Sequence, residues 1–252
     1  MNDLAPLLSL RGIGRDYGAV TAVREVDLDV FPGEILAICG DNGAGKSSLI
    51  KIISGALTPS RGSIRLRGAE VSFHSPHDAL AQGVATIYQD LALAPRLSIA
   101  ANVFMGAELT KGFGLPFLRV LDKSRMNSEA QAYLARLSVN ITDMRRPVEG
   151  LSGGQRQAVA ISRALRWNAN IIIMDEPTAA LGVKETAQVL DLIRHLKSEG
   201  RTVILISHNM ADVAALATRI AIMKSGSKVI DRPAEGLSPD DIGHMIMTGI
   251  AA

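Results

Sequence analysis

The sequence contains little of what several protein classes depend on. Its 252 residues include one cysteine, Cys39, which excludes an internal disulfide framework and a CxxC metal or redox site. Long hydrophobic runs are also missing, because apolar runs such as Ile171–Met174 and Val203–Ile206 have only the length of strands. The chain is therefore not expected to cross a bilayer by itself.

Neither sign of charge dominates the sequence. Lysine and arginine number 27, aspartate and glutamate number 25, and the formal net charge is +2. A net charge this small creates no electrostatic field strong enough to favour nucleic acid or an anionic membrane surface as a partner. The first ten residues carry Asp3 and no basic residue, so we do not expect them to act as a signal peptide.

The remaining composition is that of a globular protein, with 47% hydrophobic and 21% charged residues. It excludes a disordered chain, a collagen and a long coiled coil. A chain of this length buries roughly 70–75% of its unfolded surface, so it needs no disulfide or metal to fold. Length alone allows one or two domains.

Short apolar runs alternate with longer helical patterns. Val26–Val30 alternates between apolar and polar residues, as a half-buried strand does, whereas Ile35–Cys39 is continuously apolar, as in a strand covered on both faces. Further strands are expected at 63–67, 84–88, 171–174, 202–206, 219–224 and 228–230, and helices at about 46–55, 129–137, 152–167 and 183–197. Leu91–Asn140 is expected to be a mostly helical insertion. The alternation predicts an α/β fold with a mostly parallel sheet and antiparallel pairs near the N-terminus.

Residues 40–47 match the phosphate-loop pattern G-x-x-x-x-G-K-[ST], and they follow an apolar strand and open a helix, as the motif requires. Glycines let backbone N–H groups turn inward, and these amides form an anion site with the helix N-terminus. Lys46 would reach the β- and γ-phosphates of a nucleotide, and the Ser47 hydroxyl could ligate Mg²⁺. The alternative is a tight strand-to-helix turn that contains a lysine.

Two carboxylates, Asp175 and Glu176, end a predicted buried strand, and Pro177 follows them. Ligands of open α/β sheets bind beyond the carboxyl ends of the strands. Asp175 would hold Mg²⁺ there, as acidic residues do in phosphate-loop ATPases. Glu176 would point to the opposite side and polarise the attacking water. The alternative is a charged strand end before a proline turn.

A second glycine-rich element, residues 151–155, stands where a helix is expected to begin. Ser152 and Gln155 form an S-x-x-Q capping box, which closes an ordinary helix N-terminus. A capping box does not require two glycines, however. Gly153 and Gly154 would leave bare amides facing outward, which makes a second anion site. Neither interpretation excludes the other.

In this order, the elements resemble the ATP-binding cassette (ABC) ATPases over nearly the whole chain, and Leu151–Gln155 is identical to the LSGGQ signature of that family. The resemblance implies one ABC ATPase domain, residues 1–252. Its phosphate-loop NTPase core would comprise about 1–89 and 168–252 and include an N-terminal antiparallel β-subdomain. An α-helical subdomain would be inserted at about 90–167.

The resemblance also implies roles for single residues and the cofactors ATP and Mg²⁺. Tyr17 would stack on adenine, Gln89 would link the Mg²⁺ site to the helical subdomain and a membrane partner, and His208 would contact the γ-phosphate. The implied catalytic residues are Glu176, His208 and Lys46, and the implied Mg²⁺ ligands are Ser47, Gln89 and Asp175. The implied ATP-binding residues are Tyr17, Gly40, Asp41, Asn42, Gly43, Ala44, Gly45, Lys46, Ser47, Ser48, Gln89, Ser152, Gly153, Gly154 and Gln155.

Members of this family are expected to act as pairs, in which two copies sandwich two ATP molecules and each phosphate loop faces residues 152–155 of the other copy. Residues 72–108 and 178–185 resemble the subclass that imports monosaccharides, and the single cassette resembles its fructose-type members. One position departs from the family: Gly182 stands where an aspartate usually follows the Ala-Leu pair. This departure bears on coupling between subunits and leaves the hydrolysis chemistry intact.

The implied protein is a peripheral ATPase on the cytoplasmic face of the inner membrane. It would bind transmembrane permease subunits, be linked indirectly to a periplasmic sugar-binding protein, and have no nucleic-acid partner.

Two other functions stay open on the sequence alone. A non-transport cassette protein acting on nucleic acid or ribosomes would usually carry two cassettes, coiled coils or basic linkers, which are not visible here. Salt-sensitive binding to DNA or rRNA would favour it. A phosphate-loop kinase would lack the element at residues 152–155, and ATP consumption without water as acceptor would favour it.

Overall fold

The computed structural model describes residues 5–112 and 119–251. Within these ranges an antiparallel sheet near the N-terminus has the strand order β2-β1-β4-β5. Its strands are β1 (Leu8–Tyr17), β2 (Val20–Val30), β4 (Arg61–Leu66) and β5 (Ala69–Val71). The antiparallel pairs expected near the N-terminus are therefore confirmed, although the sequence patterns did not predict β1 and β5.

The central sheet has the strand order β12-β11-β3-β10-β9-β6. Its strands are β3 (Ile35–Cys39), β6 (Val84–Ile87), β9 (Ile171–Asp175), β10 (Thr202–Ile206), β11 (Arg219–Lys224) and β12 (Ser227–Pro233). Neighbours are parallel except β11 and β12, which form an antiparallel pair at one edge. The mostly parallel sheet of the predicted α/β fold is confirmed.

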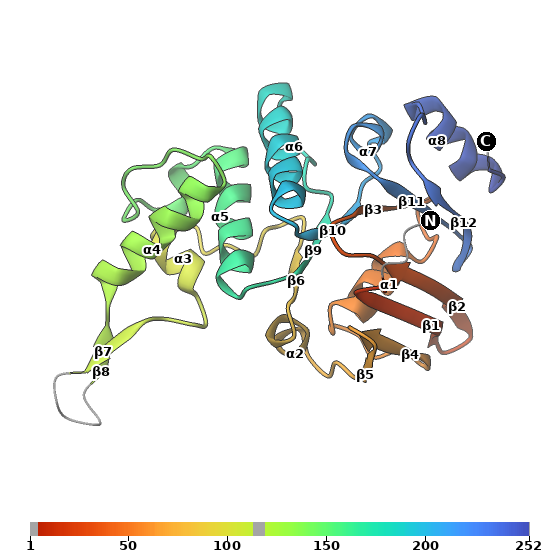
Figure 1. Ribbon diagram of the computed structural model, residues 1–252, viewed down its shortest axis with the longest axis horizontal. Coiled ribbons are helices and arrows are strands. Elements are labelled where there is room, and N and C mark those ends of the chain that lie inside the picture. The colour runs from red at the N-terminus through yellow and green to blue at the C-terminus, as the bar shows by residue number, and fades with distance from the viewer. Residues whose placement is uncertain (1–4, 113–118, 252) are drawn as a thin grey trace.

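The helices of the described ranges are α1 (Lys46–Ile53), α2 (Pro76–Ala81), α3 (Ile99–Phe104), α4 (Lys123–Arg136), α5 (Gly153–Arg166), α6 (Val183–Ser198), α7 (Met210–Leu216) and α8 (Pro239–Thr248), with a short 3₁₀ turn at Val148–Gly150. Helix α1 lies on one side of this sheet and α6, α7 and α8 on the other, while α3 and α4 lie beyond α5 at one end of the molecule (Figure 1). The helix expected at 129–137 begins earlier, because Asp122 caps it by accepting a hydrogen bond from the Arg125 amide. No helix in the described ranges is both long and apolar enough to span a membrane.

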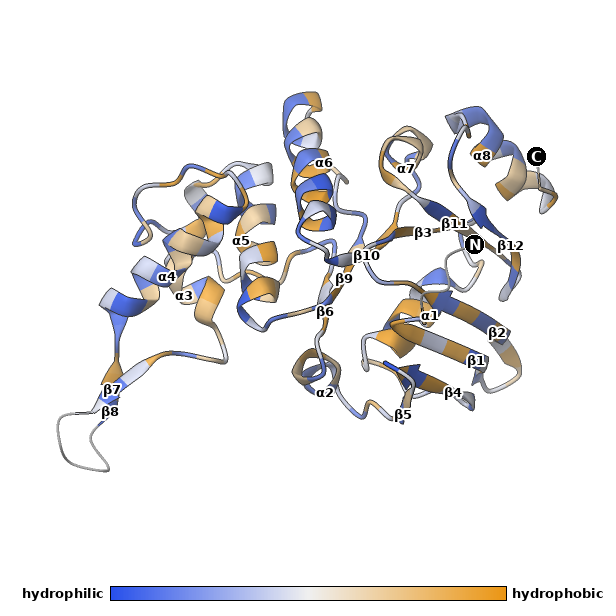
Figure 2. Cartoon of the chain, viewed as in Figure 1, coloured by the Kyte–Doolittle hydropathy of each residue, from blue (hydrophilic) through white to orange (hydrophobic). Residues whose placement is uncertain are grey.

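The two faces of the central sheet pack against different layers. Because side chains alternate along a strand, Ile171 and Ile173 of β9 pack toward α1 and the antiparallel sheet, whereas Ile172 and Met174 pack toward α5 and α6. A third apolar cluster joins β3 and β11 to α7 and α8. The continuous apolar strands thus belong to a sheet covered on both faces, while hydrophobic and hydrophilic residues alternate along β1 and β2 (Figure 2).

The insertion after β6 is less uniformly helical than expected. Helices α3, α4 and α5 lie together at one end of the molecule (Figure 1), but β7 (Thr110–Gly112) and β8 (Arg119–Leu121) form an antiparallel hairpin beside them. Every residue of both strands is exposed, so no alternation of burial marked them in the sequence. The sequence motifs predict no role for residues 106–119, and residues 113–118 of this segment lie outside the described residues.

The centre of the sheet generates a stability prediction. Leu205 of β10 is 1% exposed, so Leu205→Ala should lower the free energy of unfolding by about 2–5 kcal/mol, through lost burial and the cavity left behind. Val229→Ala on β12 is the control, since Val229 is 43% exposed, and should change it by less than about 0.5 kcal/mol. Urea unfolding followed by circular dichroism measures both, and equal losses would contradict this account of the core.

Candidate functional site

The loop at residues 40–47 connects β3 to α1 in a path that only glycine allows at two points. Gly40 has φ +149°, and a Cβ there would overlap the carbonyl oxygen of Met223 in β11. Gly45 has φ +98°, and a Cβ there would lie 2.5 Å from the carbonyl oxygen of Ala22 in β2. Both glycines therefore let the loop lie directly against neighbouring backbone.

Helix α1 begins immediately after this loop. Its N-cap residue, Gly45, makes no side-chain hydrogen bond to the helix. The first amides of a helix lack partners within the helix, and a glycine cap supplies none. They are therefore available to an anion such as a phosphate group, which fits the predicted role of the loop.

Lys46 folds back over the same loop. Its ammonium donates to the carbonyl oxygens of Gly40 at 2.6 Å and Asp41 at 2.9 Å. An ammonium carries three N–H donors, so a third remains for a ligand. The lysine is thus already placed at the loop that would hold the phosphates.

The strands beside β3 bring other predicted residues to the same edge of the sheet. Ile206 of β10 pairs with Ile38 of β3 on one side and with Asp175 of β9 on the other, and Ile87 of β6 pairs with Met174 of β9. Since all these strands run in the same direction, their carboxyl ends lie in one row. The predicted site residues at or just beyond these ends are Gly40, Gln89, Asp175, Glu176 and His208.

Asp175, the last residue of β9, is half-buried at this edge. Burial raises the pKa of its carboxyl group, the charge of Glu176 raises it further, and the Lys46 ammonium opposes the rise. Alternation along β9 places Asp175 on the α1 side of the sheet, the side to which Ile173 packs. The carboxylate therefore lies on the phosphate-loop side, as predicted for a metal ligand.

Glu176 and His208 form a direct pair. Nδ1 of His208 lies 2.7 Å from Oε2 of Glu176, and the His208 amide donates to the same oxygen at 3.4 Å. Glu176 has a left-handed backbone, φ +50°, held by its amide hydrogen bond to Ile206 at 2.9 Å. Such strain in a non-glycine residue is typical of functional sites. The sequence predicted both residues as site residues but did not predict the contact between them.

The residues predicted to bind Mg²⁺ have suitable chemistry, because Mg²⁺ prefers oxygen ligands. Ser47, Gln89 and Asp175 offer a hydroxyl, an amide oxygen and a carboxylate. In the part of the chain that the structure describes, no group of three or more His, Cys, Asp or Glu side chains is arranged to hold a metal. This donor set fits a cation that takes its remaining ligands from nucleotide phosphates and water.

The element at 151–155 differs from expectation in one respect. The predicted capping box is present: Ser152 Oγ accepts from the Gln155 amide at 3.3 Å, and Gln155 Oε1 accepts from the Ser152 amide at 3.1 Å. The prediction of bare outward amides is wrong for Gly153, because its amide donates to Oε1 of Glu185 at 2.8 Å. Gly153 and Gly154 are both buried.

The ends of neighbouring side chains lie close to both glycines. A Cβ on Gly153 would overlap the Leu181 side chain, and one on Gly154 would lie 2.8 Å from Oε1 of Gln188. The first turn of α5 thus lies against the start of α6 in the same chain. Glu185, which sequence reasoning missed, holds this contact.

Glu185 accepts from a second helix N-terminus as well. Its Oε2 accepts from the Gly182 amide at 3.4 Å, which is half of a capping box on α6. Glu185 stands three residues after Gly182, the spacing of a capping box. This spacing could have predicted its hydrogen bond to Gly182 but not the one to Gly153.

Tyr17, predicted to stack on adenine, ends β1 and is 46% exposed. The Arg15 guanidinium lies 4.9 Å from its ring centroid and donates to the carbonyl of Thr58 at 2.8 Å. Arg15 therefore covers one face of the ring, which leaves the opposite face for a base. Sequence reasoning missed Arg15.

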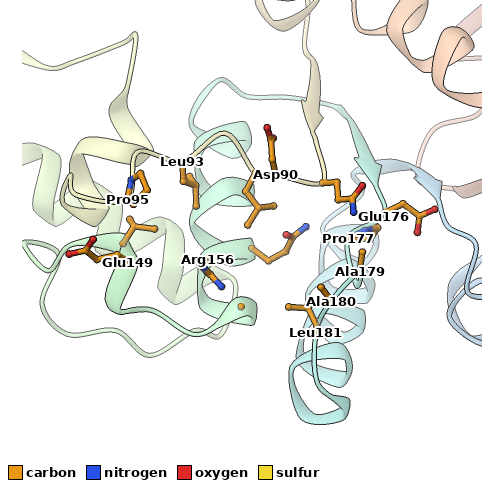
Figure 3. Close-up of a pocket in the computed structure, with 15 residues that line it drawn as sticks. Asp90, Leu93, Pro95, Glu149, Arg156, Glu176, Pro177, Ala179, Ala180 and Leu181 are labelled. Carbon is orange, nitrogen blue, oxygen red and sulfur yellow. The ribbon is translucent and has the colours of Figure 1, made fainter.

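A cavity of about 350 Å³ lies between α5 and the segments that follow β6 and β9. Its polar lining includes Gln89, Asp90, Glu149, Arg156, Gln157 and Glu176. Figure 3 shows Glu176 at one end of a row that continues through Pro177 to Leu181. Gln89 and Glu176 therefore share one space with the helix that carries the LSGGQ element.

The raised pKa of Asp175 generates a pH prediction. A carboxyl group whose pKa is raised by folding costs stability above that pKa, and the cost disappears as the pH falls below its ordinary value of roughly 4. Asp175→Asn should therefore raise the Tm of the nucleotide-free protein at pH 7, and the gain should vanish toward pH 4. Asp191→Asn, at a side chain 75% exposed, is the control without such a gain. An unchanged Tm for Asp175→Asn at pH 7 would contradict the prediction.

Comparison with known sequences gives one family and several relatives. The family described as "ABC transporter" matches residues 23–179. The fructose import ATP-binding protein FrcA of Rhizobium meliloti is 48% identical, over 95% of this chain and 94% of that protein. The xylose/arabinose import ATP-binding protein XylG of Sulfolobus acidocaldarius is 43% identical, over 98% and 96%. The ribose import ATP-binding protein RbsA 1 of Streptomyces coelicolor is 41% identical, but this chain spans only 46% of it.

Comparison with solved structures gives the same kind of protein. A dimeric structure of MJ0796, a bacterial ABC transporter cassette, is 25% identical with a TM-score of 0.73, over 91% of this chain and all of that one. The cassette MJ1267 shares the fold with a TM-score of 0.80, over 97% of this chain and 96% of its own, at 24% identity. With the phosphate loop, the paired carboxylates and the LSGGQ element in place, the chain belongs to the ABC transporter family.

Proposed function

We propose that this chain is the ATP-hydrolysing subunit of a carbohydrate importer of the fructose, ribose or xylose type. Its 48% identity to a fructose import ATP-binding protein, over nearly the full length of both chains, carries the assignment to sugar import. The arrangement of Lys46, Asp175, Glu176 and His208 at one sheet edge supports the chemistry. The transported sugar itself would be selected by other subunits.

The nucleotide would bind between the antiparallel sheet and the phosphate loop. Tyr17 stacks on adenine from the face opposite Arg15, and the loop amides with Lys46 bind the phosphates. The proposed loop contacts are Gly40, Asp41, Asn42, Gly43, Ala44, Gly45, Lys46, Ser47 and Ser48. The glycine-capped start of α1 supports this placement.

Glu176 would act on the attacking water. Its carboxylate accepts the Nδ1–H of His208, which leaves Nε2 of the same ring to contact the γ-phosphate and a second carboxylate oxygen to orient water. Mg²⁺, bound by Ser47, Gln89 and Asp175, would supply charge neutralisation at the phosphates. Catalysis then consists of positioning and electrostatic stabilisation.

A second copy would complete each site. As the family resemblance implies, Ser152, Gly153, Gly154 and Gln155 would serve ATP held by the other copy. Within the described residues the Gly153 amide is bound to Glu185, so this hydrogen bond would have to give way to the phosphate. We propose that the single domain, 1–252, consists of a core (about 1–89 and 168–252) and a helical subdomain (about 90–167). Residue 182 is a glycine, so the cross-subunit contact usual at this position would lack a carboxylate.

The remaining partners would be transmembrane permease subunits, with a periplasmic sugar-binding protein acting indirectly. The chain would then lie peripherally on the cytoplasmic face of the inner membrane. Gln89 would carry the closing motion to the permease because it belongs both to the proposed metal site and to the segment entering the helical subdomain. No nucleic-acid partner is proposed.

Glu176→Gln tests the hydrolysis step. Losing a general base should slow ATP turnover by roughly 10²- to 10⁴-fold, while ATP binding persists. The variant should then accumulate as an ATP-dependent dimer, with twice the chain mass of 26.7 kDa, in size-exclusion chromatography with light scattering. Glu70→Gln, at an exposed residue of β5, is the control. Turnover at the unmodified rate would refute the role of Glu176.

Lys46→Ala tests the phosphate loop. Without the ammonium, the γ-phosphate loses its main positive charge, so both hydrolysis and the ATP-dependent dimer of the Glu176→Gln protein should be lost. Lys123→Ala removes the same charge at the exposed start of α4 and should leave both intact. The ATPase rate and the ATP-dependent mass are the two measurements, and a Lys46→Ala protein that still hydrolyses ATP at the original rate would exclude this site.

A further inference from the structure

The segment that follows Gln89 has an unusual backbone. Leu91 and Ala92 are consecutive non-glycine residues with left-handed dihedral angles, φ +58° and +44°. An L-residue in this region brings its Cβ close to neighbouring carbonyl oxygen, which disfavours the conformation. Two such residues in succession persist only when surrounding structure holds them.

Part of that support is local, since the Leu91 amide donates to the carbonyl oxygen of Tyr88 at 2.8 Å. The Ala92 amide likewise donates to Oδ1 of Asp90 at 3.2 Å. Arg163 provides the support that comes from α5. Its NH1 donates to the carbonyl oxygen of Ala92 at 2.8 Å, and its NH2 donates to that of Leu91 at 2.9 Å. The guanidinium therefore binds both left-handed residues with one planar fork. Burial lowers the pKa of this guanidinium, so its placement is itself unfavourable and is offset by the two hydrogen bonds.

The same helix that carries Arg163 begins at the LSGGQ element. Arg163 lies on α5, whose first turn is capped by Ser152, and Gln89 lies two residues before Leu91. The guanidinium thus ties the chain just beyond Gln89 to the helix that would receive the ATP of a second copy. A shift of α5 would be transmitted to Gln89 through these two hydrogen bonds.

We propose that Arg163 is a positioning residue for Gln89, which it keeps in place for Mg²⁺ by holding Leu91 and Ala92 in the left-handed conformation. The inference rests on the proposed metal role of Gln89. Arginine is required because its fork reaches two carbonyls at once, whereas a lysine ammonium would act as a single point charge. Arg163 touches neither nucleotide nor metal itself.

Arg166 offers a matched control on the same helix. It is also half-buried and also donates to a backbone carbonyl, that of Ala107 at 2.7 Å. Ala107 lies after α3 and not beside Gln89. The Arg166 guanidinium also lies over the rings of Phe104 and Trp167, 5.0 and 5.5 Å from their centroids. Removing Arg166 therefore deletes an arginine-to-backbone bond and these ring contacts without releasing the segment at 91–92.

The test measures how strongly Mg²⁺ enhances nucleotide binding. The affinity for a fluorescent ATP analogue is measured with Mg²⁺ and with EDTA in Glu176→Gln protein, where hydrolysis does not interfere. Gln89→Ala removes a proposed ligand and Arg163→Ala releases the segment that positions it, so each should reduce the Mg²⁺ enhancement about tenfold, near the lower end of the roughly 10- to 100-fold loss typical of outer-shell changes. Arg163→Lys should give an intermediate loss, and Arg166→Ala should give none.

A double-mutant cycle separates positioning from general destabilisation. If Arg163 acts through Gln89, adding Arg163→Ala to Gln89→Ala should cause no further loss of the enhancement. Losses that multiply, or an equal loss in Arg166→Ala, would overturn the proposal. If Gln89→Ala changes nothing, the metal role of Gln89 in the proposed function falls as well. If Gln89→Ala has an effect and folded Arg163→Lys and Arg163→Ala have none, only the present inference falls.

Glycine substitution gives an independent measurement. Ala92→Gly removes the steric cost of the left-handed conformation, so in Arg163→Ala protein it should recover part of the lost Mg²⁺ enhancement. Ser138→Gly relaxes another left-handed residue, φ +57°, after α4 and should recover none. Equal recovery by the two glycines, or none by Ala92→Gly, would contradict the role assigned to the segment.

Discussion

The parallel pairing of β3, β10 and β9 is the constraint on which the site depends. It places Ile38, Ile206 and Asp175 in one row, so that the phosphate loop, the segment with His208 and the carboxylate pair begin at the same edge. The strained backbone of Glu176 follows from this pairing, since its amide is bound by Ile206 of the neighbouring strand. The position of the site is therefore set by strand register, because the loops that carry its residues start from strand ends that already lie side by side.

Local chemistry explains how much of the molecule could be predicted from the sequence. The phosphate loop, the strand ending in Asp175 and the capping box of α5 each depend on residues that are close together in the sequence, and the structure contains each of them. The contacts that could not be predicted join distant residues: Gly153 with Glu185 is 32 positions apart, and Arg163 with Leu91 is 72 apart. No periodicity encodes such pairs. The exposed hairpin of β7 and β8 escaped for a different reason, because neither of its strands has a buried face.

The glycines of the LSGGQ element show how packing and function share residues. The expectation that they expose bare amides considered only the helix they begin. The structure adds Leu181 and Gln188, which lie where side chains at Gly153 and Gly154 would stand. The start of α5 therefore lies close against side chains of the segment around the start of α6, and larger residues at 153 and 154 would require these side chains to move. A carboxylate, Glu185, satisfies the first amide and stabilises the positive end of the helix.

The balance of energies at Arg163 explains why a single side chain can control a segment. Each left-handed L-residue costs roughly 1–2 kcal/mol, so Leu91 and Ala92 together cost about 2–4 kcal/mol. A hydrogen bond from a charged donor contributes roughly 1.5–3 kcal/mol, and Arg163 makes two of them. Burial of the guanidinium adds to the cost, whereas the amides of Leu91 and Ala92 gain local hydrogen bonds to Tyr88 and Asp90. The conformation therefore depends on Arg163 together with these local bonds. A helix movement that misaligns the fork would thus remove the contribution of α5 and weaken the hold on the chain beside Gln89, as the proposal for Arg163 requires.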